Sequence, residues 1–106
     1  MVRYPAIALM LASCLAASSA AAEDVIVSQK DKAFSEKEVT IKTGDSITFV
    51  NDDTVTHNTY SRSKGNKFDS GAQAPDSSMT QTFSSPGKVK VRCAIHPRMK
   101  LTVHVE

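Results

Sequence analysis

Apolar and polar residues alternate along most of the chain after residue 23, and a period of two is typical of half-buried β-strands. The clearest case is residues 88–93, where Val89, Val91 and Cys93 alternate with basic residues. The same pattern predicts shorter strands over residues 24–27, 38–42, 46–50, 57–60, 79–83 and 101–105. No stretch has helical periodicity, and there is no internal repeat.

Turn signals separate these predicted strands. Thr43-Gly44-Asp45 and Ser84-Ser85-Pro86-Gly87 are turn sequences, and residues 51–54 are loop-forming Asn, Asp and Thr. Residues 61–76 have little periodicity, so we expect a long irregular connection there. Short strands at this spacing predict an all-β fold, a Greek-key β-sandwich of seven or eight strands.

The first 22 residues have a different pattern. A basic start, a short apolar run and an Ala20-Ala21-Ala22 exit predict a secretory signal peptide over residues 1–22, with cleavage after Ala22. The run is too short to span a membrane, so we expect an exported, periplasmic domain over residues 23–106 and no membrane span. Alternatively, Leu11-Ala12-Ser13-Cys14 resembles a lipoprotein cleavage box, which would leave Cys14 acylated on a membrane.

Composition adds two constraints. The formal net charge of the chain is only +2, which gives no case for nucleic acid as a partner. A domain of this size is marginally stable without a disulfide or a metal. Cys93 is the single cysteine left after cleavage, and a lone thiol in an oxidising compartment needs an occupant. A buried apolar cysteine is the plain alternative.

The residues that follow Cys93 favour a metal. Cys93, His96 and Met99 form a Cys-x₂-His-x₂-Met motif, and strand alternation points the sulfur of Cys93 into the sandwich at its rim. Soft sulfur ligands select copper, and two His, one Cys and a weak axial Met make a blue-copper electron-transfer site. His57, in the polar segment upstream, is the candidate for the second imidazole. Alone, His57 would more often be a solvated loop residue and Met99 a core residue.

The histidines and Cys93 also admit other roles. Cys93 could be a catalytic nucleophile with His57 or His96 as base, but an inward-facing sulfur and the nearby Met99 argue against it, so we expect no enzyme. His104 alternates with inward-facing Leu101, Val103 and Val105, so we expect it on the surface without a role.

The chain resembles the cupredoxins, and among them the small periplasmic plastocyanin-like, amicyanin-like and methylamine-utilisation-type proteins. The resemblance spans the predicted mature chain and includes residues 34–35, 39–51, His57-Asn58 and Pro86-Gly87, and the Cys-x₂-His-x₂-Met spacing is that of amicyanin. It implies that His57, Cys93 and His96 are strong copper ligands, that Met99 is the long axial ligand, and that the Asn58 backbone N–H donates to the Cys93 sulfur. It also implies an exposed His96 edge in an apolar patch as the electron port.

Together these observations predict a monomeric periplasmic type 1 copper protein, with one ion cycling between Cu(I) and Cu(II), that carries single electrons between redox proteins. A periplasmic copper chaperone or buffer that uses the same ligands is the alternative function. Arg98 and Lys100 beside His96 suggest an acidic docking surface on the partner, although such bases can also be a solvated rim.

Overall fold

The computed structural model describes residues 22–106 and contains nine strands. Cys14 and the predicted signal peptide, apart from Ala22, lie outside the described residues. The strands are β1 (Asp24–Lys30), β2 (Ala33–Phe34), β3 (Glu38–Ile41), β4 (Ser46–Asn51), β5 (His57–Ser61), β6 (Phe68–Gln73), β7 (Ser78–Thr82), β8 (Gly87–Arg92) and β9 (Lys100–Val105). None of the described residues forms a helix, so none belongs to a helix that could cross a membrane.

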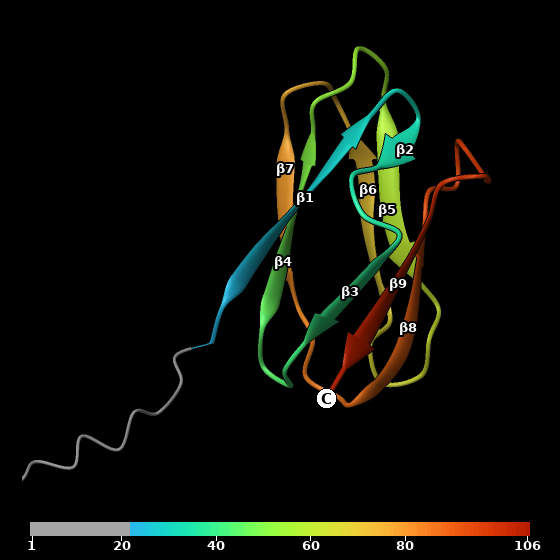
Figure 1. The fold of residues 1–106 in the computed structure, drawn as a ribbon. Coiled ribbons are helices and arrows are strands. Elements are labelled where there is room, and N and C mark those ends of the chain that lie inside the picture. Colours follow the sequence, from blue (N-terminus) through green and yellow to red (C-terminus); the bar gives the residue numbers. More distant parts are fainter. Residues whose placement is uncertain (1–21) are drawn as a thin grey trace, which may run out of the picture.

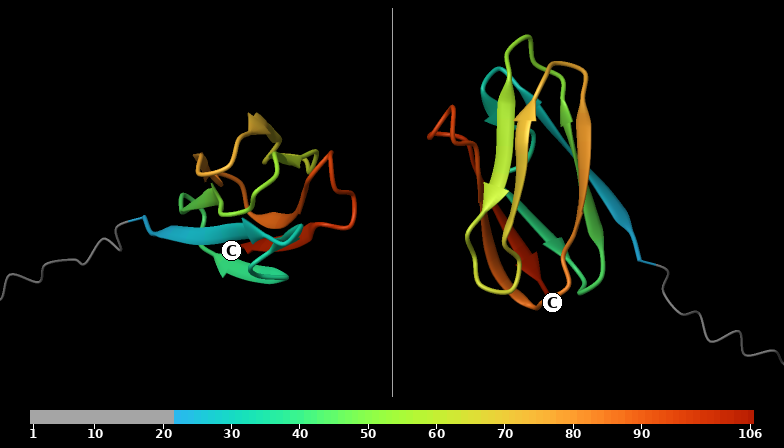
Figure 2. Two further views of the ribbon diagram at one scale, coloured as in Figure 1. Left: turned by 90° about the horizontal axis from the view of Figure 1, so that it is seen from above. Right: turned by 180° about the vertical axis from the view of Figure 1, so that it is seen from behind.

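The strands form two sheets, which confirms the predicted all-β sandwich. One sheet has the order β2-β1-β4-β7 and the other the order β3-β9-β8-β5-β6. Within each sheet one pair is parallel, β1 with β4 and β3 with β9, and the remaining pairs are antiparallel. The strands run along the long axis of the sandwich, and their turns gather at its two ends (Figures 1 and 2).

The strand count exceeds seven or eight because β2 and β6 were not predicted. The expected irregular connection over residues 61–76 is wrong for residues 68–73, which form β6 at the edge of the five-stranded sheet. Asp, Ser, Gly and Ala have low strand propensity, so pairing with β5 decides the conformation here. Phe68 anchors the strand, because its ring stacks on Phe49 of the opposite sheet at 6.1 Å between centroids.

The core contains the residues that the alternation of apolar and polar positions predicted to face inward. Val89, Val91 and Cys93 are buried, as are Leu101 and Val103, and the bases that alternate with them lie at the surface or half-buried. Phe49 is fully buried at the centre, between Phe34 and Phe68. Burial of this apolar surface is the main force that holds the two sheets together.

A buried polar network lies between the sheets near the start of β5. Thr59 and Gln73 are bonded at 2.8 Å and Gln29 donates to Gln73 at 3.1 Å, with all three side chains at most 4% exposed. The amide of Asn51 donates to the carbonyl of Gln73 and to that of Val55. These bonds fix the β4–β5 loop against the sandwich, which sets where His57 begins the next strand.

Candidate metal centre

Cys93 directly follows β8, and the alternation of that strand carries its sulfur into the sandwich, where the residue is 1% exposed. The chain then turns sharply. The Met99 N–H donates to the His96 carbonyl at 2.9 Å, which closes a four-residue turn with Pro97 in the second position. Proline fixes its own φ and stiffens this turn. The turn brings Cys93, His96 and Met99 to one end of the sandwich, away from the chain terminus marked C (Figure 1).

His57 reaches the same point from another direction. It is the first residue of β5, is fully buried, and pairs in register with Gln73 of β6. Three donor atoms therefore converge: His57 Nδ1 lies 3.8 Å from Cys93 Sγ, His96 Nδ1 lies 3.9 Å from it, and the two nitrogens are 3.1 Å apart. The sequence-based expectation that His57 lies beside the Cys93 turn is confirmed.

These distances fit a metal ion. The triangle they define has its circumcentre about 2.1 Å from each donor, and a divalent ion such as zinc makes bonds of about 2.0–2.1 Å to imidazole and 2.3 Å to thiolate. Two imidazole nitrogens that present lone pairs to each other at 3.1 Å repel unless a proton or a cation lies between them. Two imidazoles and a thiolate are the donor set of a blue-copper site.

Met99 ends the turn that begins at His96 and offers a soft thioether sulfur close in sequence to Cys93 and His96. It is 1% exposed and, like Cys93, is part of the hydrophobic core. A neutral thioether favours copper over the harder cations, which prefer oxygen ligands.

Asp53 orients the ring of His57. Its Oδ2 lies 2.9 Å from His57 Nε2 and accepts the Lys32 N–H at 2.9 Å. An ionised carboxylate can only accept a hydrogen bond, so the ring proton of His57 sits on Nε2. The lone pair of Nδ1 is therefore free to bind a metal. The Lys32 N–H, and then the His57 ring, lower the pKa of Asp53 to about 2, so the carboxylate stays ionised.

Asn58 ties the cluster to the sheet. Its N–H donates to Cys93 Sγ at 3.3 Å, the bond that the resemblance implied. Its side chain accepts the Ala94 N–H at 3.1 Å and donates to Asp69 Oδ1 at 2.7 Å. One asparagine thus connects β5 and β6 to the first residues of the turn after Cys93.

His96 lies where the cluster meets the surface. It is half-buried, beside Ile95, which is 51% exposed. Burial, and then the nearby His57 ring, lower the pKa of His96 and favour the neutral imidazole. Lys32, Ile95, His96, Pro97 and Arg98 line one surface pocket, so two basic residues flank this histidine.

Sequence reasoning missed Asp53 and Lys32. The available sequence signal for Asp53 was its position four residues before a candidate ligand. Lys32 is brought to the site by the β1–β2 turn, and nothing in the sequence pattern indicates this contact. His104 lies in β9 and pairs with Glu38 of β3 at 3.2 Å, outside the cluster, as expected. Among residues 22–106, His57, Cys93 and His96 form the one group of His, Cys or acidic side chains whose ligand atoms lie close enough together to share a metal ion.

Solved structures share this fold. A purple cupredoxin from Nitrosopumilus maritimus is 24% identical with a TM-score of 0.69, and the match covers 78% of this chain and 100% of that one. A copper(I) form of an amicyanin variant is 21% identical with a TM-score of 0.73, over 78% of this chain and 82% of that one. The copper-containing nitrite reductase of Thermus scotoductus is 26% identical with a TM-score of 0.72, but this chain spans only 22% of its length.

No curated protein sequence matches this chain significantly. The model of a protein family does. The family described as copper binding proteins of the plastocyanin/azurin type matches residues 21–106, which include every strand and the whole donor cluster. The donor chemistry and the family model agree on the metal, and copper is the cofactor. The chain belongs to the plastocyanin/azurin family of copper-binding proteins.

Proposed function

We propose that His57, Cys93 and His96 hold one copper ion with Met99 as a weak fourth ligand, and that the protein carries single electrons between redox partners in the periplasm. The observation that carries this proposal is the triangle of His57 Nδ1, Cys93 Sγ and His96 Nδ1, with edges of 3.1 to 3.9 Å. Bound copper supplies a centre that accepts one electron from a donor and passes it to an acceptor, alternating between Cu(II) and Cu(I).

The protein's contribution is to keep the donors in place. A carrier works fast when gaining an electron requires little movement of its ligands, and here each donor is held by a separate bond. Asp53 fixes the ring of His57, the Asn58 N–H holds the sulfur of Cys93, and the turn closed by the Met99 N–H holds His96. These contacts preorganise the site before metal arrives.

Electrons are proposed to pass through His96. It is the one imidazole of the cluster that is not fully buried, and exposed Ile95 and Pro97 surround it with apolar surface. Apolar surface around a ligand edge lets two proteins approach closely without desolvating charges. Lys32 and Arg98 at the margin would recruit an acidic partner surface.

Export is supported by the pattern of residues 1–22 and by the chemistry of a lone thiol that needs an occupant outside the cytoplasm. We propose a soluble periplasmic monomer with residues 23–106 as its mature domain, and a role as carrier rather than enzyme. Attachment through an acylated Cys14 is the alternative form.

The proposal is tested by adding Cu(II) to the purified protein. We expect an intense blue or violet colour and a reversible one-electron wave. Cys93→Ser should abolish the colour because the thiolate is lost, and Met99→Leu should keep the colour while changing the potential. Met79→Leu is the matched control, because Met79 is partly buried in β7 and outside the cluster.

The same experiment separates a carrier from a chaperone or buffer. A carrier keeps its copper through repeated oxidation and reduction, whereas a Cu(I) buffer releases the metal or resists oxidation. Loss of copper on each oxidation would therefore overturn the electron-transfer role while leaving the ligands intact.

A further inference from the structure

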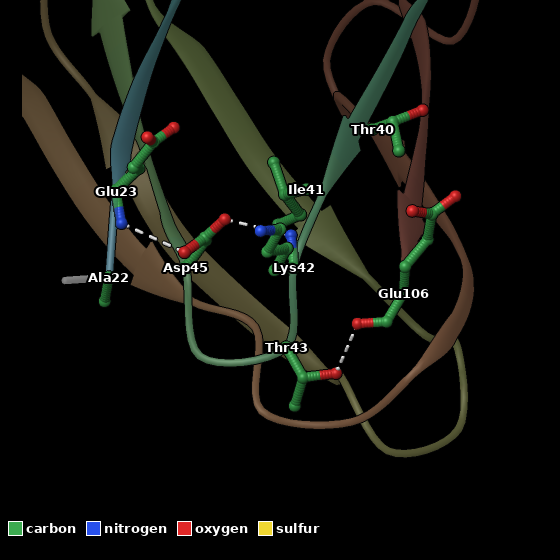
Figure 3. Close-up of a pocket in the computed structure, with 8 residues that line it drawn as sticks. All are labelled: Ala22, Glu23, Thr40, Ile41, Lys42, Thr43, Asp45 and Glu106. Carbon is green, nitrogen blue, oxygen red and sulfur yellow. Dashed lines mark hydrogen bonds between the residues drawn. The ribbon is translucent and has the colours of Figure 1, made fainter. Parts of the chain in front are cut away.

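The end of the sandwich opposite the donor cluster contains a carboxylate aimed at the start of β1. Asp45 belongs to the β3–β4 turn and is 8% exposed. Its Oδ1 accepts the Glu23 N–H at 2.9 Å and its Oδ2 accepts the Lys42 N–H at 2.9 Å (Figure 3). The Glu23 and Lys42 backbone bonds lower the pKa of Asp45, which keeps the group ionised.

Residue 23 is also held by its own backbone. The Ser46 N–H donates to the Glu23 carbonyl at 2.9 Å, so the β1–β4 ladder continues to this residue. Gly44 has φ of +94° and allows the turn that presents Asp45 to this position. Ala22, in contrast, is exposed and forms one edge of a pocket of about 300 Å³ rather than part of the core (Figure 3).

Cleavage after Ala22 would change the chemistry of this contact without removing core packing. Water adds across the Ala22–Glu23 peptide bond: its hydroxyl completes the carboxyl group of Ala22, and the Glu23 nitrogen becomes a primary amine. At neutral pH the amine takes a further proton and becomes an α-ammonium group. The nitrogen that lies 2.9 Å from Asp45 Oδ1 would then carry a full positive charge.

We propose that Asp45 is the built-in counter-ion for the N-terminus created by this cleavage, so that processing by a signal peptidase forms an ion pair that fixes β1 on β4. This inference rests on the export that the proposed function includes. A charge-assisted hydrogen bond is about twice as strong as a neutral one, and a largely buried acceptor is screened less than an exposed one.

The ion pair makes stability depend on pH in a defined window. Asp45 raises the pKa of the α-ammonium group above its ordinary value of about 7.7–8.0, so this contribution is complete below pH 7.7 and is lost as pH rises through the raised pKa. The lowered pKa of Asp45 means that the contribution is present above pH 4 and is lost in stronger acid. The other charged groups here are Glu23 and Asp24 on the same segment and Lys42 and Glu106 across the pocket.

The test uses the full chain produced in a bacterium that exports it, purified with its copper. Intact mass should identify Glu23 as the first residue. Nuclear magnetic resonance titration of the α-amino group should give a pKa above the ordinary range, and Asp45→Asn should return that pKa to it. The blue colour and the potential should stay unchanged in Asp45→Asn, so failure here is distinguishable from failure of the copper proposal.

Acetylation of the α-amine in the unmodified sequence provides a measurement that needs no substitution. It should increase the unfolding equilibrium constant about fivefold at pH 6 and have no effect at pH 10, where the free amine is already neutral. A mature chain that begins at an acylated Cys14, a retained leader, or an α-amino pKa in the ordinary range would overturn the proposal.

Discussion

Asp53 has three partners. Its carboxylate accepts the N–H of Lys32 and of Thr54 and lies against His57 Nε2. Asp31 and Lys32 both have positive φ, which costs energy for residues other than glycine, and the two form the tight turn between β1 and β2. Asp53 thus holds a strained turn and orients a proposed copper ligand at the same time.

Removing this carboxylate should weaken the site. We expect Asp53→Ala to lower Cu(II) affinity by about 10- to 100-fold, because outer partners of metal-bound histidines contribute on that scale. Asp53→Asn keeps an acceptor but loses the charge, so its affinity loss should be smaller. Both variants should raise the reduction potential, because the lost negative charge stabilised Cu(II) more than Cu(I). Competition titration and voltammetry measure the two quantities.

Asp52→Asn is the matched control for this prediction. Asp52 is the neighbouring carboxylate, is exposed, and bonds to Ser28 rather than to His57. The substitution Asp52→Asn therefore removes the same charge without affecting a bond to the ring of His57. Equal shifts in Asp52→Asn and Asp53→Asn would show that only the overall charge of the loop matters, against a positioning role.

Predictability from sequence differs between these residues for a physical reason. The direction of Cys93 followed from the two-residue period of β8, and the turn after it kept His96 and Met99 close. Residues 51–56 have no period, so the four-residue spacing of Asp53 and His57 marks Asp53 as a possible partner without showing where either side chain points. The contact with Lys32 joins segments that are far apart in sequence, and tertiary structure alone brings them together.

At the scale of elements, the edge strand β6 supports the metal-binding end through β5. Asn58 donates to Asp69 of β6, while the same side chain accepts the Ala94 N–H that begins the ligand turn. Asp69 also accepts the N–H of Gly71, which has φ of +68° and produces an irregularity in the strand. The register shift between Asn58 and Tyr60 lies beside this bond.

Exchanging the two side chains tests this connection. In the unmodified protein Asn58 Nδ2 lies 2.7 Å from Asp69 Oδ1. Asn58→Asp replaces this donor with a second carboxylate and should destabilise the metal-free protein by about 1–3 kcal/mol. Adding Asp69→Asn restores a donor facing an acceptor, but its amide nitrogen replaces the oxygen that also accepts the Gly71 N–H, so the double variant should recover only part of this loss in denaturant unfolding. Asp69→Asn alone is the second arm of the cycle.

The copper-loaded form should behave differently. In the double variant the negative charge moves from residue 69 to residue 58, next to Cys93, so its potential should stay below that of the unmodified protein while its stability partly recovers. Stability that does not recover would show that the pair does not hold β5 to β6.

The strand β6 was not predicted from the sequence. Residues 68–73 contain Asp, Ser, Gly and Ala, which favour turns, and only Phe68 offers a core contact. Alternation predicted β8 and β9 because their inward faces are Val, Leu and Cys. The conformation of β6 depends instead on the free edge of β5 and on buried polar partners such as Gln73, which residue types alone do not reveal.

At the scale of the whole molecule, the two ends of the sandwich differ in chemistry. One carries the donor cluster with Lys32, Arg98 and exposed Ile95, and the other carries Asp45 and the start of β1 (Figures 1 and 3). Substitutions at distant sites that share no partner residues usually act independently, so we expect each end to be alterable separately. Charge changes near His96 should therefore affect encounters with partners without affecting stability.

Electron exchange between two copies of the protein tests the basic margin without any knowledge of the natural partner. If electrons pass through His96, two copies must meet face to face, and Lys32 and Arg98 of each would repel those of the other. Each pair of like charges costs about 0.4 kcal/mol at 10 Å in water, and salt of about 0.1 M screens most of it. The self-exchange rate should therefore rise with ionic strength.

Arg98→Gln should raise the self-exchange rate about three- to fivefold at low salt, because several repulsive pairs disappear at once. It should have little effect at high salt, and it should slow transfer to an acidic partner. Lys88→Gln is the matched control, since Lys88 is exposed at the start of β8, the opposite end from Cys93. Line broadening in mixtures of oxidised and reduced protein measures the rate. Equal effects of the two substitutions would mean that only net charge matters, and a rate that falls with salt would place the electron port away from His96.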